Sequence, residues 1–320
     1  MEDYPRNLRE FDARFSSEEA CRRYLEQLRW PDGFRCPICG SGKSWPVRGV
    51  LRQCAGCGHQ TSATAGTIFQ DTRSPLRLWF QAMWWMTTQK NGASALGLQR
   101  VLGLKQYQTA WTWLHKLRSA MVRPGRDLLR GRVEVDESYL GGLEEGLRGR
   151  LTETKALIAV AAQEEGRGIG RIRLRYIPDA SGESLHAFIQ ESITPGSIVH
   201  TDGWRGYSGL EAKGYVHQVT VLKRKKEPAS DLLPRVHRVI SLLKRWLMGT
   251  HQGAVSHKHL DYYLDEFTFR FNRRRSNSRG KLFYRLVQQA VAVGPSPYGT
   301  IVGKATGERR TAKPQAIGVA

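Results

Sequence analysis

The sequence is poor in acidic residues and has no long apolar run. Asp and Glu total 29 against 50 Lys and Arg in 320 residues, which gives a formal net charge of +21. A surface of that sign attracts polyanions, nucleic acid first and anionic membrane second. Residues 1–30 contain no apolar run like that of a signal peptide, and the most apolar stretch, Leu76–Met86, is too short to span a bilayer. We therefore expect a cytoplasmic protein with a nucleic-acid partner and no membrane partner.

Cysteine is also scarce, but four of the five cysteines form two close pairs. Cys36-Pro-Ile-Cys39-Gly and Cys54-Ala-Gly-Cys57-Gly are separated by fourteen residues. Two residues between thiolates let both sulfurs point at one ion, and the glycine behind each pair permits a tight turn. Two reactive or disulfide-bonded pairs are the alternative. We predict one structural Zn²⁺ on Cys36, Cys39, Cys54 and Cys57, with Cys21 as a core thiol outside the site.

Composition and hydrophobic periodicity divide the chain into five segments. We expect a helical lead-in at 1–30, a zinc ribbon at 31–70, a helix-turn-helix DNA-binding domain at 74–122, an α/β domain at 131–292 and a flexible basic tail at 293–320. The α/β interpretation depends on short β-branched runs that alternate with helical patterns. The tail is rich in Gly, Pro, Ala and Lys, as flexible termini are.

Three helices are predicted within residues 74–122, over Pro75–Lys90, Ser94–Leu102 and Lys105–Met121. The last two are joined by a short turn that contains Gly103, as in a helix-turn-helix. The residues expected to face the core are Tyr107, Trp111 and Leu114. The residues expected to reach DNA are Lys105, Gln106, Thr109 and Thr112. A plain three-helix packing unit without DNA contacts is the alternative.

Two aspartates are predicted at the ends of neighbouring strands. Arg132-Val-Glu-Val-Asp136 runs into a glycine turn, and Asp202 ends the apolar run Ser197–Asp202. Glu134 lies on the same strand face as Asp136 because side chains alternate with a period of two. Two carboxylates so placed repel each other unless a divalent cation neutralises them, and Mg²⁺ is the usual cation in phosphoryl transfer. Each aspartate taken alone is also compatible with a turn or a helix cap.

A predicted helix over Val236–Met248 supplies a third element. His237 and Lys244 are seven positions apart, about two helical turns, and therefore point the same way. A metal ligand and a cation at this spacing suit a metal ion beside a DNA phosphate. The amphipathic segment that starts at Lys258 ends in a basic cluster, and we expect Arg273 and Arg274 to contact the DNA backbone, with a solvated surface as the alternative.

Together these motifs resemble the ISXO2-like transposases of insertion sequences. The matching pieces, in family order, are the two cysteine knuckles, Gln60–Phe69, the helix-turn-helix, Val133–Glu137, His200–Trp204, Ser241–Arg245, Tyr263–Phe267 and Arg270–Arg274. The resemblance implies a ribonuclease H-like catalytic core in which Asp136, Asp202 and Lys244 match the family's two aspartates and lysine. The third position holds His237, which is 237 − 202 = 35 positions after Asp202. The family usually has Asn or Glu there.

The resemblance implies a transposase that binds the terminal inverted repeats of its element and catalyses metal-dependent DNA cleavage and strand transfer. Its partners would be double-stranded end and target DNA, bound by a homo-oligomer. The catalytic Mg²⁺ or Mn²⁺ would be held by Asp136, Asp202 and His237, with Glu134 as the next candidate ligand if His237 is not one. One alternative is a catalytically inactive zinc-ribbon DNA-binding protein derived from a transposase, which His237 favours. A nuclease or resolvase that cuts without joining is another.

Overall fold

The computed structural model describes residues 2–123, 125–141, 155–221, 232–253 and 255–303, which form two compact units. The first unit joins the described residues before Gly125 to those from Arg275 onward. The second spans Gly125 to Arg274. In the described part of the chain, no helix is long and apolar enough to cross a membrane.

Short capped helices open the first unit. These are α1 (Leu8–Arg14) and α2 (Glu18–Arg29). Asn7 and Ser17 precede them, and their side chains accept hydrogen bonds from the backbone N–H groups of Glu10 and Ala20. Such caps satisfy N–H groups that have no partner within the helix. Apolar side chains on one face of these helices, including Phe11 and Leu25, are buried.

A small antiparallel sheet follows, with the order β1-β2-β3. Its strands are β1 (Ser44–Val47), β2 (Leu51–Cys54) and β3 (Gln60–Thr61). The two cysteine pairs have the same turn geometry. Gly40 and Gly58 both have a φ of +72°, and their N–H groups donate to the carbonyl oxygens of Cys36 and Cys54. Glycine adopts this left-handed conformation without the strain that a Cβ would add.

Three helices match the periodicity of the sequence: α3 (Leu76–Thr88), α4 (Ala95–Leu102) and α5 (Tyr107–Ala120). Ser94 caps α4, and Gly103 ends it with a φ of +62°. Of the three residues expected in the core, Leu114 is buried and Trp111 is half-buried. The prediction for Tyr107 is wrong: it is 50% exposed, because it is the first residue of α5 and lies at the open end of that helix.

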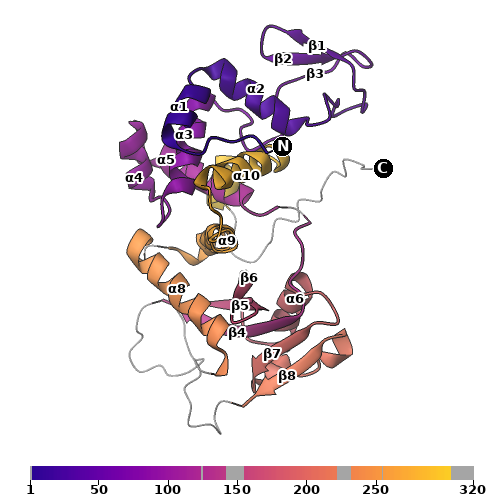
Figure 1. The fold of residues 1–320 in the computed structure, drawn as a ribbon, viewed down its shortest axis with the longest axis vertical. Coiled ribbons are helices and arrows are strands. Elements are labelled where there is room, and N and C mark those ends of the chain that lie inside the picture. Colours follow the sequence, from indigo (N-terminus) through magenta and orange to yellow (C-terminus); the bar gives the residue numbers. More distant parts are fainter. Residues whose placement is uncertain (1, 124, 142–154, 222–231, 254, 304–320) are drawn as a thin grey trace. The chain divides into compact units, whose positions relative to one another are not determined.

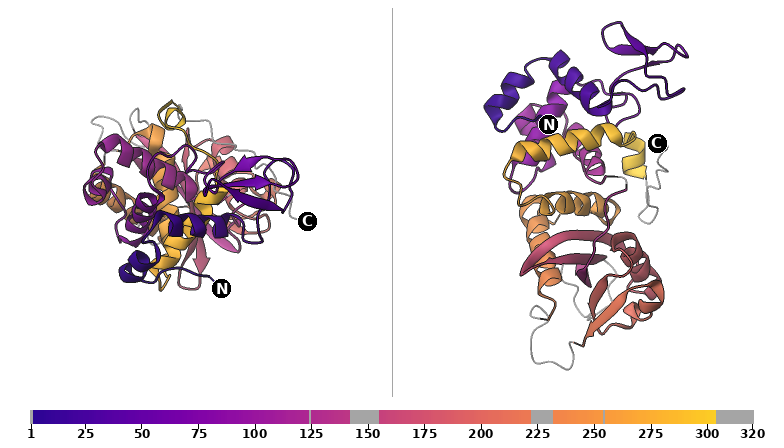
Figure 2. Two further views of the ribbon diagram at one scale, coloured as in Figure 1. Left: turned by 90° about the horizontal axis from the view of Figure 1, so that it is seen from above. Right: turned by 45° about the vertical axis from the view of Figure 1, so that its right-hand side comes forward.

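The C-terminal helices pack in the first unit, which differs from the expected ranges. Helix α10 (Arg279–Ala292) contacts α2, α3 and α5, although the sequence placed residues up to 292 in the α/β domain. Figures 1 and 2 show α10 beside the N-terminal helices. Within the expected tail, Tyr298–Gly303 forms α11 with Ile301 buried. The remainder of that tail, 304–320, lies outside the described residues.

The second unit contains a five-stranded sheet in the order β6-β5-β4-β7-β8. Its strands are β4 (Arg132–Leu140), β5 (Ala156–Glu165), β6 (Gly168–Ile177), β7 (Ile198–Asp202) and β8 (Val216–Thr220). Strand β5 pairs antiparallel with β4 and β6, whereas β4, β7 and β8 run parallel. The expected strands are therefore present, and the unit is a mixed α/β domain.

Helices cover both faces of this sheet. Helix α6 (Gly182–Ser192) packs on one face, and α8 (Pro234–His251) and α9 (Leu260–Phe271) pack on the other (Figure 1). On β4, Val133 and Val135 belong to the α6 core and Leu140 to the α8 core. Because side chains alternate along a strand, Glu134 and Asp136 lie on the face that α8 covers.

Candidate active site

The four cysteines of the ribbon converge on one point. Their Sγ atoms all lie within 4.8 Å of one another. The Sγ atoms of Cys36 and Cys57 are 3.6 Å apart, and those of Cys39 and Cys54 are 3.5 Å apart. No other group of three or more His, Cys, Asp and Glu ligand atoms comes so close in the part of the chain that the structure describes. The predicted metal-binding cluster is therefore confirmed.

The four thiols interact, so that the pKa values of Cys36 and Cys54 are lowered and those of Cys39 and Cys57 are raised. Burial raises the pKa of the Cys54 thiol, but backbone N–H groups of Cys57 and Gly56 and the neighbouring thiols outweigh it and lower the pKa to about 6. A thiol with so low a pKa is largely a thiolate at neutral pH, the form that binds metal. Cys21 lies outside this group, and burial raises the pKa of its thiol to about 12. Its side chain is fully buried, as expected for a core thiol.

Asp136 and Asp202 occupy matching positions on the neighbouring strands β4 and β7. The ladder between β4 and β7 ends at the pair Glu134 and His200, and each aspartate stands two residues beyond that pair. Both are therefore on the face that α8 covers. The expectation that Asp136 ends its strand is wrong, since β4 continues to Leu140. The end of the parallel ladder, and not the end of the strand, marks this position.

His237 lies against Asp136. Its Nε2 is 3.6 Å from Oδ2 of Asp136, and the two side chains are 28% and 14% exposed. This nitrogen is buried and has no hydrogen-bond partner among the described residues. Burial lowers the pKa of His237, although the carboxylates of Glu134 and Asp202 oppose the shift. A neutral imidazole nitrogen and a carboxylate oxygen that face each other can both serve as ligands of a divalent cation.

Lys244 lies two turns further along α8, in the field of the same carboxylate. Desolvation lowers its pKa, Asp136 opposes that shift and Lys155 adds to it. The side chain is nevertheless exposed. A cation at this place is accessible to a phosphate from outside the protein.

Asp202 is close to this pair but is held separately. One carboxylate oxygen, Oδ1, accepts a hydrogen bond of 2.9 Å from the backbone N–H of Trp204. Its charge acts on His237 and on Tyr207. The ligand atoms of Asp136, Asp202 and His237 do not all lie within 4.8 Å of one another, a criterion that only the four cysteines meet among the described residues. The structure thus brings two of the predicted ligands together and places the third nearby.

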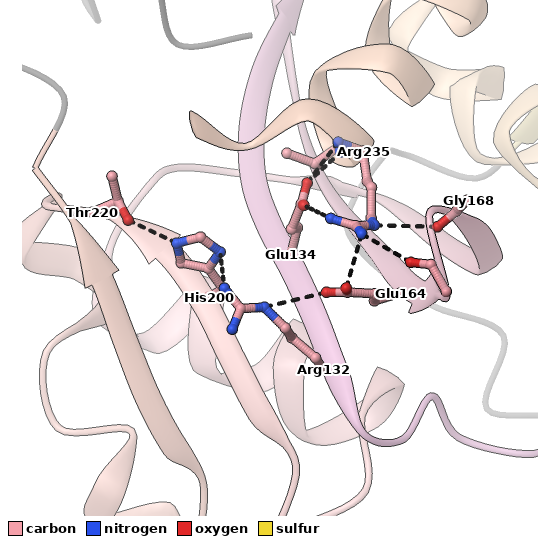
Figure 3. A network of polar contacts seen from close by, with 9 residues as sticks. Arg132, Glu134, Glu164, Gly168, His200, Thr220 and Arg235 are labelled. Carbon is pink, nitrogen blue, oxygen red and sulfur yellow. Dashed lines mark hydrogen bonds and ion pairs between the residues drawn. The ribbon is translucent and has the colours of Figure 1, made fainter. Parts of the chain in front are cut away.

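Sequence reasoning missed what Glu134 does. The carboxylate is 1% exposed and accepts hydrogen bonds from the N–H groups of Arg235 and Val236 and from Nη1 of Arg235 (Figure 3). Because both of its oxygens are occupied, Glu134 is unsuited to the role of replacement metal ligand. A signal was present in the sequence. Arg235 follows a proline in the first turn of a helix, where a cation is unfavourable without an acidic partner.

Tyr207 is the other residue that the sequence did not reveal. It ends the short 3-10 helix Arg205–Tyr207, is fully buried and donates a hydrogen bond of 2.7 Å to Oε2 of Glu137. Burial raises its pKa well above the usual value, and the carboxylates of Glu137, Asp136 and Asp202 raise it further. Tyr207 is therefore an uncharged donor beside the acidic group.

The residues expected to contact DNA fall into two kinds. Lys105 and Gln106 are exposed, and Thr109 and Thr112 are half-buried. Together with Lys116, the last three of these border a cavity of about 380 Å³ at the start of α5. Arg273 and Arg274 are instead engaged within their own unit.

These two arginines stack on aromatic rings of α9. Arg273 lies 4.0 Å from the ring centre of Phe269 and Arg274 the same distance from that of Phe271. Arg274 also donates to the carbonyl oxygens of Gly170 and Phe271. These contacts occupy part of each guanidinium group, while Arg274 remains exposed, and the predicted contact of both residues with the DNA backbone stays a prediction.

Comparison with known proteins gives two family matches. Residues 128–272 match the ISXO2-like transposase domain, and residues 16–60 match the transposase zinc-ribbon domain. A relative from Halobacterium salinarum, an uncharacterized protein in the transposable element ISH50, is 27% identical over 278 residues. That alignment covers 80% of this chain and 91% of the relative.

The solved structures that match include the cryo-EM structure of a simian T-cell lymphotropic virus intasome in complex with PP2A regulatory subunit B56 gamma. Its TM-score is 0.32 with 13% identity, over 60% of this chain and 70% of that chain, and so weak a likeness carries no argument. The family matches, the four-cysteine cluster and the mixed sheet agree with one another. The chain therefore belongs to the ISXO2-like transposases of insertion sequences, with an N-terminal zinc ribbon and a ribonuclease H-like core.

Proposed function

We propose that this chain is an active transposase that binds the terminal inverted repeats of its element and cuts and joins DNA there. The observation that carries the proposal is the pairing of His237 and Asp136. The buried Nε2 of His237 is 3.6 Å from Oδ2 of Asp136 and has no hydrogen-bond partner among the described residues. A buried nitrogen without a partner is costly, and a bound cation would remove that cost.

Asp136, Asp202 and His237 would hold the catalytic metal. Carboxylates suit Mg²⁺ and Mn²⁺, whereas an imidazole favours Mn²⁺. When bound, such a cation activates a water and stabilises the leaving oxygen. Binding by all three ligands requires the carboxylate of Asp202, whose Oδ1 accepts a hydrogen bond from the N–H of Trp204, to approach the other two.

The proposed reaction has two balanced steps. Water attacks the phosphorus at the element's end, the P–O3′ bond breaks, and the element keeps a free 3′-hydroxyl while the flank keeps a 5′-phosphate. That hydroxyl then attacks a target phosphodiester and displaces a new 3′-hydroxyl. Lys244, exposed beside Asp136, would bind the phosphate under attack and offset its charge.

DNA recognition is assigned to the first unit. Zn²⁺ on the four cysteines would hold the ribbon in its fold. Lys105, Gln106, Thr109 and Thr112 would contact the end DNA, and a homo-oligomer would bring two ends together. A cytoplasmic location fits this assignment, since free thiolates need a reducing compartment.

A second function has one observation in its favour. The three catalytic ligand atoms are not all within 4.8 Å of one another, as would be expected of a DNA-binding protein that had lost its metal site. The decisive experiment is cleavage of a labelled duplex that carries the element's end, with Mg²⁺, Mn²⁺ or neither. Metal-dependent nicking at the end supports the transposase, and binding without nicking supports the inactive protein. A strand-transfer assay with pre-cleaved ends tests joining separately. An enzyme that nicks the end but does not join pre-cleaved ends to target DNA would be a nuclease.

A further inference from the structure

A partly buried polar network lies on the sheet face that α8 covers, next to the proposed metal ligands (Figure 3). Its centre is Arg235. The guanidinium donates to Oε1 of Glu134 at 2.9 Å, pairs with Oε1 of Glu164 at 2.9 Å and reaches the carbonyl oxygens of Gly166 and Gly168 at 3.2 Å. All three nitrogens of the guanidinium are thereby used. Such a fork with two carboxylates has little freedom to move.

The network continues across the parallel strands. Glu164 also pairs with Arg132, whose Nη2 is 3.3 Å from Nδ1 of His200. Because an arginine can only donate, Nδ1 must accept, and Nε2 carries the proton that it donates to Oγ1 of Thr220 at 2.8 Å. The chain of contacts therefore ties β4, β5, β7 and β8 to the start of α8.

Three members of this network each precede a proposed catalytic residue by two positions. Glu134 precedes Asp136, His200 precedes Asp202, and Arg235 precedes His237. Glu134 and His200 are also partners in the last pair of the parallel ladder. The same backbone segments thus carry a fixed polar contact and, two residues later, a side chain of the site.

Glu134 has the strongest hold on α8. This helix begins at Pro234, has no side-chain cap of its own and has no acidic residue in its first turn. Its N–H groups at Arg235 and Val236 donate to Oε2 of Glu134 at 2.7 and 3.0 Å. A buried carboxylate at a helix N-terminus satisfies these donors and complements the helix dipole.

We propose that Glu134 is a positioning residue for the active site: its carboxylate anchors the first turn of α8 to β4 and so sets His237 and Lys244 against Asp136. This inference rests on the proposed function, since it assigns the reason why those side chains must be held. Glu134 acts through α8 and not on the reacting atoms. Residues that orient metal ligands in this way commonly change activity by about 10–100-fold when they are replaced.

The test compares Glu134→Gln with Glu266→Gln. Glu266 is a matched control because it is a fully buried carboxylate in the same unit, paired with Arg270 at 2.8 Å, on a helix that holds none of the proposed metal ligands. We expect Glu134→Gln to lower kcat for end cleavage about 10–100-fold with KM for DNA within about twofold. We expect Glu266→Gln to keep kcat within about twofold of the parent, measured below the Tm of all variants.

Hydrogen exchange supplies a readout that needs no activity. Glu134→Gln should speed exchange in the first turns of α8, by about tenfold or more, while the rest of the second unit exchanges as in the parent. If Glu134→Gln does not fold, Glu134→Asp decides the matter, because it keeps the charge but withdraws the carboxylate by one methylene. It should show the same two effects at smaller size.

Either of two results would overturn the inference. One is a parental kcat in a folded Glu134 variant. The other is a loss of kcat with unchanged exchange in α8, which would mean that Glu134 acts on the reaction directly. If the parent itself does not cleave end DNA, the proposed function fails, and the exchange measurement still decides whether Glu134 anchors α8.

Discussion

The two proposed metal sites of this chain are built in opposite ways. All four sulfurs of the ribbon come from residues 36–57 and lie within 4.8 Å of one another. The catalytic site draws Asp136 from β4, Asp202 from β7 and His237 from α8, and its ligand atoms do not all meet that limit. The first site is encoded by local spacing, and the second depends on the whole second unit.

The two sites should therefore be sensitive to different kinds of change. A knuckle needs two cysteines and a glycine in a left-handed turn, so its geometry survives changes elsewhere in the chain. The catalytic site needs the parallel ladder and the first turn of α8 in register. Changes that never touch a ligand, such as those at Glu134 or Arg235, should therefore affect the second site and leave the first intact.

Removal of the ribbon's metal should give the largest effect. Structural zinc in small modules contributes about 10–16 kcal/mol of binding free energy, which is also folding free energy. We expect one zinc per chain in the parent and none in Cys54→Ser, with rapid proteolysis of the ribbon. Cys21→Ala, a change at a buried thiol outside the cluster, should keep its zinc. Elemental analysis and limited proteolysis measure both, and a zinc-free parent with intact ribbon and DNA binding would contradict the assignment.

Loss of one catalytic carboxylate should come next. Asp136→Asn or Asp202→Asn removes a charge that offsets the cation, at a cost of several kcal/mol in the transition state, so cleavage should fall on the order of 10³-fold. The ribbon should keep its zinc, and end-DNA affinity should hold or rise slightly because a negative charge is lost. Cleavage kinetics and mobility-shift titration separate the two effects. Equal losses of affinity and cleavage would count against a catalytic role.

Replacement of His237 tests the third catalytic position, where histidine stands in place of the Asn or Glu expected from the family resemblance. His237→Ala should abolish cleavage if the nitrogen is a ligand, and His237→Glu should keep part of it, because a carboxylate is a natural Mg²⁺ ligand. Cleavage in Mg²⁺ and in Mn²⁺ measures both. Parental activity in His237→Ala would remove this residue from the site.

The smallest effects are expected at the DNA-contacting residues. Affinity should fall steeply with salt because a chain of net charge +21 displaces counterions from phosphates. Lys105→Ala should reduce the salt slope by about one. Arg274→Ala should instead lower Tm by a few degrees with little change in slope, since Arg274 is engaged by Phe271 and Gly170. A parental Tm together with a reduced salt slope in Arg274→Ala would indicate that Arg274 contacts DNA.

The sequence was most informative where structure is local. The cysteine spacing, the turn at Gly103 and the apolar stripes of α3 to α5 need only nearby residues. It failed where partners are distant. Glu134 and Arg235 are about a hundred positions apart, and the packing of α10 on α2 and α3 joins opposite ends of the chain. Hydrophobic periodicity carries no information about contacts between residues so far apart in the sequence. Tyr107 was wrongly predicted to face the core, because helical spacing does not show which turns of a helix other elements cover.

A metal-specificity switch tests whether the carboxylate of Asp136 contacts the catalytic metal directly. In Asp136→Cys a thiolate replaces the carboxylate, and thiolates bind Mg²⁺ poorly but accept softer cations. We expect the variant to be inactive on end DNA in Mg²⁺ and to recover part of its cleavage in Mn²⁺ or Cd²⁺, with Glu266→Cys showing no such switch. Cleavage by Asp136→Cys that is equal in all three metals, or undiminished in Mg²⁺, would show that Asp136 does not contact the catalytic metal.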